Sequence, residues 1–203
     1  MQPELVLASG SPRRKELLRS LGVPFSVHPS SVTEEVPGSP SPGELVEILA
    51  AKKALAVAHT KRYAVVIGSD TVVSLEGDIL GKPANHADAV RILERLSGQA
   101  HQVYTGITLV EVNEGKVRRR LIDHRVTEVM VRNMDRAEIE WYVSTGEPMD
   151  KAGAYGLQGI GSLWVDWIDG CYTNVVGMSL PLLYDMLKKM DYPVLYPLPT
   201  PEQ

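Results

Sequence analysis

A short apolar run, a tight turn and an amphipathic helix open this chain and constrain its fold more than any other feature. The run covers residues 5–8 and predicts a buried strand. A Ser-Gly-Ser-Pro turn follows, and the helix begins with Ser11 as its N-cap and Pro12 in the first helical position. Leucines supply a buried stripe, and Gly22 ends the helix. The order of these signals predicts a strand–turn–helix unit.

The first turn of this helix favours an anion. Its backbone N–H groups lack intrahelical acceptors and point toward the preceding turn, which contains Ser9. Arg13 and Arg14 lie at the same end, where cations oppose the helix dipole unless an anion lies between them. One interpretation is a phosphate-binding corner. The alternative is a solvated basic surface, and this segment alone does not decide between them.

The rest of the chain interleaves helices with strands and hairpins. Capping boxes at Ser41/Glu44 and Asp135/Glu138 predict two helix starts. Further helices are expected after Asn85 and over residues 180–190, a central strand over 63–68, and hairpins over 71–80 and 103–132. Because hairpins occur beside the strand–helix alternation, we expect a mixed sheet in the α/β or α+β class.

Composition narrows the class of protein. A chain of 203 residues corresponds to one large domain or two closely packed lobes. The net charge of −4 argues against a general nucleic-acid binder, and no apolar run approaches the roughly 18 residues of a membrane span. The single cysteine, Cys171, excludes an intramolecular disulfide, and no signal-peptide pattern opens the chain. We therefore expect a cytoplasmic protein with neither nucleic-acid nor membrane partners.

Two charged residues are placed for chemistry. Lys52 follows Leu45 by seven residues and is expected on the buried stripe of the second helix, from which it either reaches solvent or enters a polar cavity. Lys53 is expected to turn toward solvent. Asp70 follows the apolar run 63–68 and is expected at the carboxyl end of a strand, where open α/β sheets place ligands. A carboxylate there can hold a hard cation or orient a water.

Three weaker candidates lie in loops. Lys82 follows the predicted hairpin closely enough to point back at the same end of the sheet. Glu34 and Glu35 could add oxygen ligands for a metal, and at least one of them is expected to be surface. The five histidines lack metal-ligand spacing, which argues against zinc.

A glycine-dense segment covers residues 150–161 and matches neither the P-loop nor a dinucleotide fingerprint. Glycines allow close backbone approach and positive φ. Gln158, between glycines, offers both a donor and an acceptor, which match the edge of a uracil or thymine base and, after rotation, those of other bases. Together these candidates fit a magnesium-dependent enzyme acting on a nucleoside triphosphate. They comprise the phosphate-binding corner, lysines, carboxylates and an amide that can pair with a base.

Five motifs in order resemble the Maf nucleotide pyrophosphatases over about residues 4–190. They are the segments 8–18, 52–54, 68–71, 80–83 and 146–159. The resemblance implies hydrolysis of nucleoside triphosphates to the monophosphate and pyrophosphate, with a divalent cation (Mg²⁺, or Mn²⁺ or Co²⁺), in a cytoplasmic homodimer. It also implies an elongated mixed sheet with flanking helices and two lobes around a cleft, as in the inosine triphosphate pyrophosphatases. Residues 1–191 would form this domain and residues 192–203 a proline-rich tail.

The same resemblance places the family's proposed catalytic acid on Asp70 and its specificity-linked positions on Arg13, Thr71 and Gln158. The other roles follow from the residues themselves. Asp70 would act on water or hold the metal, with Glu34 as a further candidate ligand, and Lys52 and Lys82 would neutralise charge on the triphosphate. Ser9 and Arg14 would add substrate contacts at the phosphate-binding corner.

The glutamine at position 158 resembles the branch of the family that acts on dTTP and UTP. Modified pyrimidine nucleotides are further candidates, in a house-cleaning role. Two alternatives stay open: a nucleotide-binding regulator of septum formation and cell division, and a pyrophosphatase for inosine or 7-methylguanosine triphosphates. A binder needs cations but no carboxylate at the triphosphate, which favours the enzyme.

Overall fold

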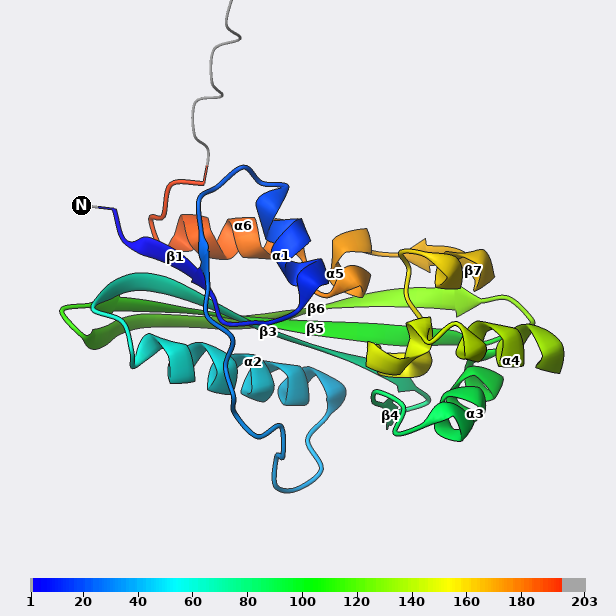
Figure 1. Ribbon diagram of the computed structural model, residues 1–203. Coiled ribbons are helices and arrows are strands. Elements are labelled where there is room, and N and C mark those ends of the chain that lie inside the picture. The colour runs from blue at the N-terminus through cyan, green and yellow to red at the C-terminus, as the bar shows by residue number, and fades with distance from the viewer. Residues whose placement is uncertain (1, 195–203) are drawn as a thin grey trace, which may run out of the picture.

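A single mixed sheet forms the body of the protein in a computed structural model that describes residues 2–194 (Figure 1). Its seven strands follow the order β2-β1-β3-β5-β6-β7, and β4 pairs with β3. β1 is parallel to both of its neighbours, and the other pairs are antiparallel. The strands are β1 (Glu4–Leu7), β2 (Ser26–Val27), β3 (Tyr63–Leu75), β4 (Asp78–Leu80), β5 (Ala100–Asn113), β6 (Lys116–Val131) and β7 (Val165–Asp169).

Helices flank this sheet on both faces and at one end. α2 lies along one face, α1 and α6 lie on the other, and α3 and α4 gather at the end farthest from β1 (Figure 1). The α-helices are α1 (Pro12–Arg19), α2 (Pro42–Ala58), α3 (His86–Leu96), α4 (Arg136–Ser144), α5 (Tyr172–Val176) and α6 (Leu180–Lys189). Short 3₁₀ helices are η1 (Glu147–Asp150), η2 (Ala152–Ala154) and η3 (Ile160–Trp164). The expected mixed sheet with flanking helices is confirmed. No helix within residues 2–194 has the length and apolar character needed to cross a membrane.

Local capping signals predicted the helix starts well. Both capping boxes form, at Ser41 and at Asp135, and the Asn85 side chain accepts from the backbone N–H of Asp88. Ser11 holds the N-cap position of α1, but its side chain makes no capping bond. Instead, the Ser11 N–H donates to the Ser9 hydroxyl at 3.2 Å, which fixes the turn before α1.

The apolar run at 63–68 is only the first half of a longer strand. β3 continues to Leu75 and pairs with β5 from Tyr63 to Ser74. Asp70 therefore lies inside a strand, opposite Gly106 of β5, and the prediction that it follows the strand's carboxyl end was wrong. It does lie beyond the end of the parallel neighbour, because the pairing with β1 stops at Ile67.

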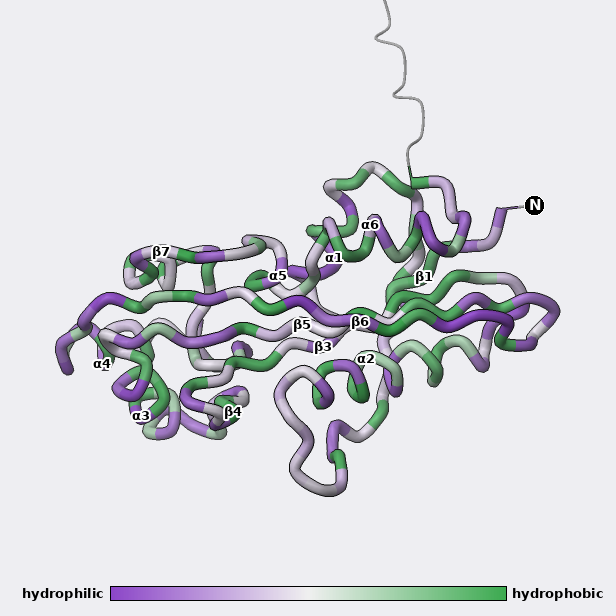
Figure 2. The backbone as a smooth tube through the Cα atoms, turned by 180° about the vertical axis from the view of Figure 1, so that it is seen from behind, coloured by the Kyte–Doolittle hydropathy of each residue, from purple (hydrophilic) through white to green (hydrophobic). Residues whose placement is uncertain are grey.

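Three hydrophobic clusters pack against the sheet. One lies between the sheet and α1 and α6, and a second lies between the sheet and α2. Hydrophobic residues, green in Figure 2, are frequent in β1 and the strands beside it. The third lies at the far end, among α3, α4 and the 3₁₀ helices. Tyr192 and Val194 are buried in the first cluster, so the core continues past residue 191. The rest of the expected tail, 195–203, lies outside the described residues.

Two glycines let α2 lie directly on the sheet. A Cβ at Gly68 would stand 2.1 Å from the Ala50 carbonyl oxygen, and one at Gly106 would stand 2.4 Å from that of Val46. Both obstacles are helix backbone, which cannot rotate away. The close approach holds α2, and with it the side chains it presents, at a fixed distance from β3 and β5.

Gly68→Ala should lower the free energy of unfolding by about 3 kcal/mol, because overpacking against rigid neighbours forces backbone shifts. Urea denaturation measures this loss. Gly81→Ala is the matched control, since no atom lies within 4 Å of the place its new methyl group would take and its φ is not positive. An equal effect of both substitutions would contradict the packing argument.

A buried histidine beside the third cluster makes stability depend on pH. His101 of β5 is 2% exposed, and its Nε2 lies 2.8 Å from the Tyr155 hydroxyl oxygen. Burial lowers the pKa of His101 from 6.5 to about 4. The unfolded chain therefore binds this proton below about pH 6.5, whereas the folded protein does not until the pH approaches 4. Stability is lost as the pH falls through that window.

Between pH 7 and pH 4.5, His101 should cost the wild-type protein about 2 to 3 kcal/mol of unfolding free energy. His101→Gln should remove this component, so its stability should fall less over the same interval. Urea denaturation at several pH values measures the two slopes. The control is His59→Gln, at the exposed end of α2, which should retain the wild-type slope. Parallel curves for His101→Gln and the wild type would refute the assignment.

Candidate active site

A cavity of about 590 Å³ lies where α1, α2 and the segment around η2 meet the middle of β3. Its walls come from the turn before α1, the middle of β3, one side of α2, the loop after β4, residues 150–158 and the end of α5. This volume is typical of small-molecule sites. Segments from most of the chain therefore meet at one place.

The cavity lining is cationic although the chain is acidic. Five lysines and arginines line it, against three carboxylates, while the whole chain carries −4. The charged lining residues are Arg13, Arg14, Lys53, Lys82, Lys151, Glu34, Asp70 and Asp150. An excess of positive charge in a concave site attracts a polyanion.

Asp70, Lys53 and Glu34 form the central ionic group. The Lys53 Nζ lies 2.5 Å from Asp70 Oδ1 and 2.6 Å from Glu34 Oε1. Asp70 is only 7% exposed, on the floor of the cavity. The ammonium group of Lys53 holds the pKa of Glu34 below its usual value. Two carboxylates around one cation also offer the hard oxygen ligands that a divalent metal prefers, so these residues fit a metal.

Lys52 does not enter the cavity, contrary to expectation. Its Nζ donates to the Glu35 carbonyl oxygen at 2.6 Å, in an exposed contact. The face of α2 that packs on the sheet carries Val46 and Ala50, and Lys53 continues that face. Ile48 follows Leu45 by three residues and so falls on the predicted buried stripe, but it is exposed. The stripe is therefore rotated by about one residue from the predicted one, and Lys53 takes the position assigned to Lys52.

Arg14 is held by protein groups on the cavity wall. Its Nε donates to the Gly177 carbonyl oxygen at 2.8 Å, and its Nη2 donates to the Thr71 hydroxyl at 3.1 Å. The Ser9 hydroxyl accepts from Nη1 at 3.4 Å. Burial lowers the pKa of Arg14, and the charge of Asp70 opposes this shift. The expected residues Ser9, Arg14 and Thr71 are thus brought together, in one network that also fixes the end of α5.

Arg13 lies across the cavity from the glycine-dense segment and reaches it. Its Nη1 contacts Asp150 Oδ2 at 2.7 Å. Although burial alone raises the pKa of Asp150, contacts with Lys151 and Arg13 keep it below its usual value. At the start of α1 the helical bonds begin with Lys15 N–H donating to the Ser11 carbonyl oxygen, so the N–H groups of Arg13 and Arg14 have no intrahelical acceptor and can donate to an anion.

Lys82 and Gln158 also line the cavity, as expected. Lys82 lies just after β4 and is close enough to contribute to the lowered pKa of Glu34. Among the described residues the Gln158 side chain has no hydrogen-bond partner, so its amide can bind a ligand. The sequence missed Asp150 and Lys151 as lining residues, although both lie in the glycine-dense segment that it singled out.

A second group of possible metal ligands lies outside this cavity. Glu47, Asp123 and His124 place ligand atoms within 4.8 Å of one another, and His124 Nδ1 lies 2.7 Å from Glu47 Oε1. None of the three lines the cavity. Their spacing in the sequence gives no metal-binding signal, because α2 and β6 bring them together only in the fold.

A buried carboxylate, surrounding cations and a free amide in one cavity define a site for a phosphorylated ligand with a polar ring. The chain belongs to the Maf-like protein family, which its residues 4–190 match. This result confirms the resemblance seen in the sequence.

Curated relatives match nearly the whole chain. The dTTP/UTP pyrophosphatase of Pelotomaculum thermopropionicum is 48% identical over 192 residues, covering 95% of this chain and 99% of its own. A protein of the same name from Gloeobacter violaceus is 49% identical over 191 residues, covering 94% of this chain and 98% of its own. The nucleoside triphosphate pyrophosphatase of a Synechococcus species is 46% identical over 193 residues, covering 95% and 96%.

Proposed function

We propose that this protein hydrolyses dTTP and UTP to the nucleoside monophosphate and pyrophosphate. The observation that carries the proposal is the cationic cavity, with the Asp70–Lys53 pair on its floor and the free amide of Gln158 on its wall. Membership of the Maf-like family and the names of the relatives support the same activity. Modified pyrimidine triphosphates belong to the same substrate class.

The triphosphate chain binds at the N-terminal end of α1 and among the cavity's cations. Lys82 is exposed and Arg13 is half-buried, and neither is committed to the protein core. The triphosphate competes with Asp150 for the Arg13 guanidinium. Arg14, bonded to Gly177 and Thr71, acts mainly by shaping the wall and by adding positive charge to it.

The base lies at the end of the cavity formed by residues 156–158. The Gln158 amide donates to and accepts from the N3–H and O4 edge of uracil or thymine. Its neighbour Leu157 also lines the cavity and supplies apolar surface for a base. Thr71 affects specificity through Arg14, because its hydroxyl is already bonded to that residue.

Hydrolysis is a single displacement at the α-phosphorus. Asp70 orients a water, or accepts its proton, and the water oxygen forms a bond to the α-phosphorus. The bond from that phosphorus to the bridging oxygen breaks, and pyrophosphate leaves with the bonding electron pair. Lys53 and Lys82 neutralise the charge that develops, which is commonly the largest contribution to phosphoryl transfer.

Asp70 and Glu34 are the residues that would hold a divalent cation. Mg²⁺ binds in proteins through one or two carboxylates, with substrate phosphates and waters completing its shell. When bound, the cation would supply further positive charge to the triphosphate; Mn²⁺ and Co²⁺ are alternatives. Lys53, which contacts both carboxylates, balances their charge when no cation is present.

Family membership supports further parts of the proposal. The fold is two-lobed, like that of the inosine triphosphate pyrophosphatases, with the cavity between the lobes and with the domain extending at least to Val194, which is buried in the first cluster. The protein is a homodimer. It works in the cytoplasm, where a lone thiol such as Cys171 stays reduced.

A pyrophosphate-release screen with Mg²⁺ tests the proposal over dTTP, UTP, CTP, ATP, GTP, and inosine and 7-methylguanosine triphosphates. We expect the highest kcat/KM for dTTP and UTP. Preference for a purine would contradict the assignment of Gln158. Binding without release from any nucleotide would instead support the nucleotide-binding regulator.

A further inference from the structure

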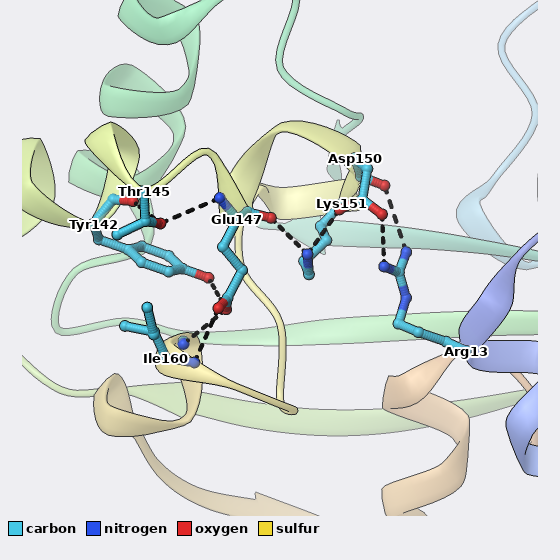
Figure 3. A network of polar contacts seen from close by, with 8 residues as sticks. Arg13, Tyr142, Thr145, Glu147, Asp150, Lys151 and Ile160 are labelled. Carbon is cyan, nitrogen blue, oxygen red and sulfur yellow. Dashed lines mark hydrogen bonds and ion pairs between the residues drawn. The ribbon is translucent and has the colours of Figure 1, made fainter.

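One carboxylate outside the cavity holds the segment that carries Gln158. Glu147 begins η1 and does not line the cavity. Its Oε2 accepts from the Ile160 N–H at 3.0 Å, and its Oε1 accepts from the Gly161 N–H at 3.0 Å and from the Tyr142 hydroxyl at 2.9 Å (Figure 3). Three donors thus converge on one side chain, just after Gln158 in the chain.

The backbone after Gln158 is shaped to lie against this carboxylate. Gly159 has φ +84°, and a Cβ there would stand 2.8 Å from Glu147 Oε2. A Cβ at Gly161 would stand 2.5 Å from the Tyr142 hydroxyl oxygen. The chain therefore fits closely around Glu147 and Tyr142, and Tyr142 is fully buried in α4.

The same group connects to the phosphate side of the cavity. Lys151 Nζ donates to the Glu147 carbonyl oxygen at 2.5 Å and contacts Asp150 Oδ1 at 2.7 Å. Asp150 in turn contacts Arg13 (Figure 3). A continuous series of polar contacts therefore runs from the arginine at the start of α1 to the segment that follows Gln158.

We propose that Glu147 is a positioning residue that fixes the Gln158 amide and thereby sets the preference for a pyrimidine base. This inference rests on the proposed function. Base recognition by one amide requires its donor and acceptor at fixed positions, and a displacement of the loop removes both bonds at once. Without the carboxylate, two backbone N–H groups and a buried hydroxyl lose their acceptor, which is costly enough to move a short loop.

The test is Glu147→Gln, which conserves the volume but removes the charge and one acceptor oxygen. We expect KM for UTP and dTTP to rise at least about tenfold with kcat within about threefold, because ground-state positioning is lost. The ratio of kcat/KM for UTP to that for inosine triphosphate should fall by a similar factor. Hydrolysis of methyl triphosphate, which has the same phosphate chain without a base, should stay within about twofold of wild type.

Glu140→Gln is the matched control. Glu140 lies on the exposed side of α4 and pairs with Arg136, so all three substrates should give wild-type values. Tyr142→Phe removes one of the three donors without changing the packing volume. It should shift the base preference in the same direction by a smaller factor. This variant tests the proposal if Glu147→Gln does not fold.

The outcomes separate this inference from the proposed function. An unchanged base preference in both Glu147→Gln and Tyr142→Phe would overturn the inference alone. An equal loss on methyl triphosphate and UTP would also overturn it, because the residue would then support the whole cavity. Failure of the wild-type protein to hydrolyse any nucleoside triphosphate would refute the proposed function and this inference together.

Discussion

Asp70→Asn should lower kcat for dTTP and UTP by about a thousandfold or more, while KM changes much less. The substitution keeps the side chain's shape on the cavity floor but removes the negative charge and the proton-accepting oxygen. Positioned acid–base groups contribute about 10²- to 10⁴-fold, and loss of a metal ligand adds to this. Steady-state pyrophosphate release measures the effect under saturating Mg²⁺.

A matched control separates chemistry from folding. Asp78→Asn makes the same change on exposed β4, where the carboxylate pairs with Arg95, and should leave kcat unchanged. Urea denaturation of Asp70→Asn should still show a cooperative transition, because Lys53 retains Glu34 as an ionic partner. Turnover by Asp70→Asn within tenfold of wild type would remove Asp70 from the mechanism.

The helix starts could be predicted because their signals are local. A capping box needs only residues three apart, and those at Ser41 and Asp135 both form as the sequence indicated. The long hairpin of β5 and β6 also follows from alternating runs around a short glycine turn. Each of these features is decided within a few residues, so tertiary contacts did not override them.

The position of Asp70 within its strand could not be predicted in the same way. Gly68-Ser-Asp70-Thr is turn-like in composition, and so the sequence indicated a break. In the fold, Gly68 is required by the close approach of α2. The polar side chains are satisfied by distant partners, since Ser69 donates to the Gly177 carbonyl oxygen. A strand whose polar residues are paired across the chain cannot be distinguished locally from a turn.

Helix periodicity could not predict whether Lys52 or Lys53 faces the cavity. An apolar stripe through Leu45 and Ile48 is as regular as one through Val46 and Ala50, because this helix carries apolar residues on several sides. Only the contact with Gly68 and Gly106 selects the second stripe, and those glycines lie far away in the sequence. The sequence predicted that a lysine of this helix enters the cavity, but it assigned that position to Lys52, whereas Lys53 occupies it.

Lys53→Met should therefore lower kcat/KM for dTTP and UTP by about a hundredfold or more, whereas Lys52→Met should stay within about twofold of wild type. Both substitutions remove one positive charge and retain a long unbranched chain in the same helix, so net charge and helix propensity change equally. They differ in their contacts: Lys53 contacts Asp70 and Glu34 in the cavity, whereas Lys52 donates to the Glu35 carbonyl oxygen in an exposed contact.

The size of the Lys53 effect follows from its surroundings. Its ammonium group is largely withdrawn from water, where a charge acts on its neighbours more strongly than in solvent. Removing it leaves the two carboxylates without their shared cation when a triphosphate binds beside them. Substrate affinity and turnover should therefore both fall. Raising Mg²⁺ should partly restore Lys53→Met, because a cation can replace some of the lost charge, and should not affect Lys52→Met. An equal loss in both variants would show that total charge matters and not the contact with Asp70.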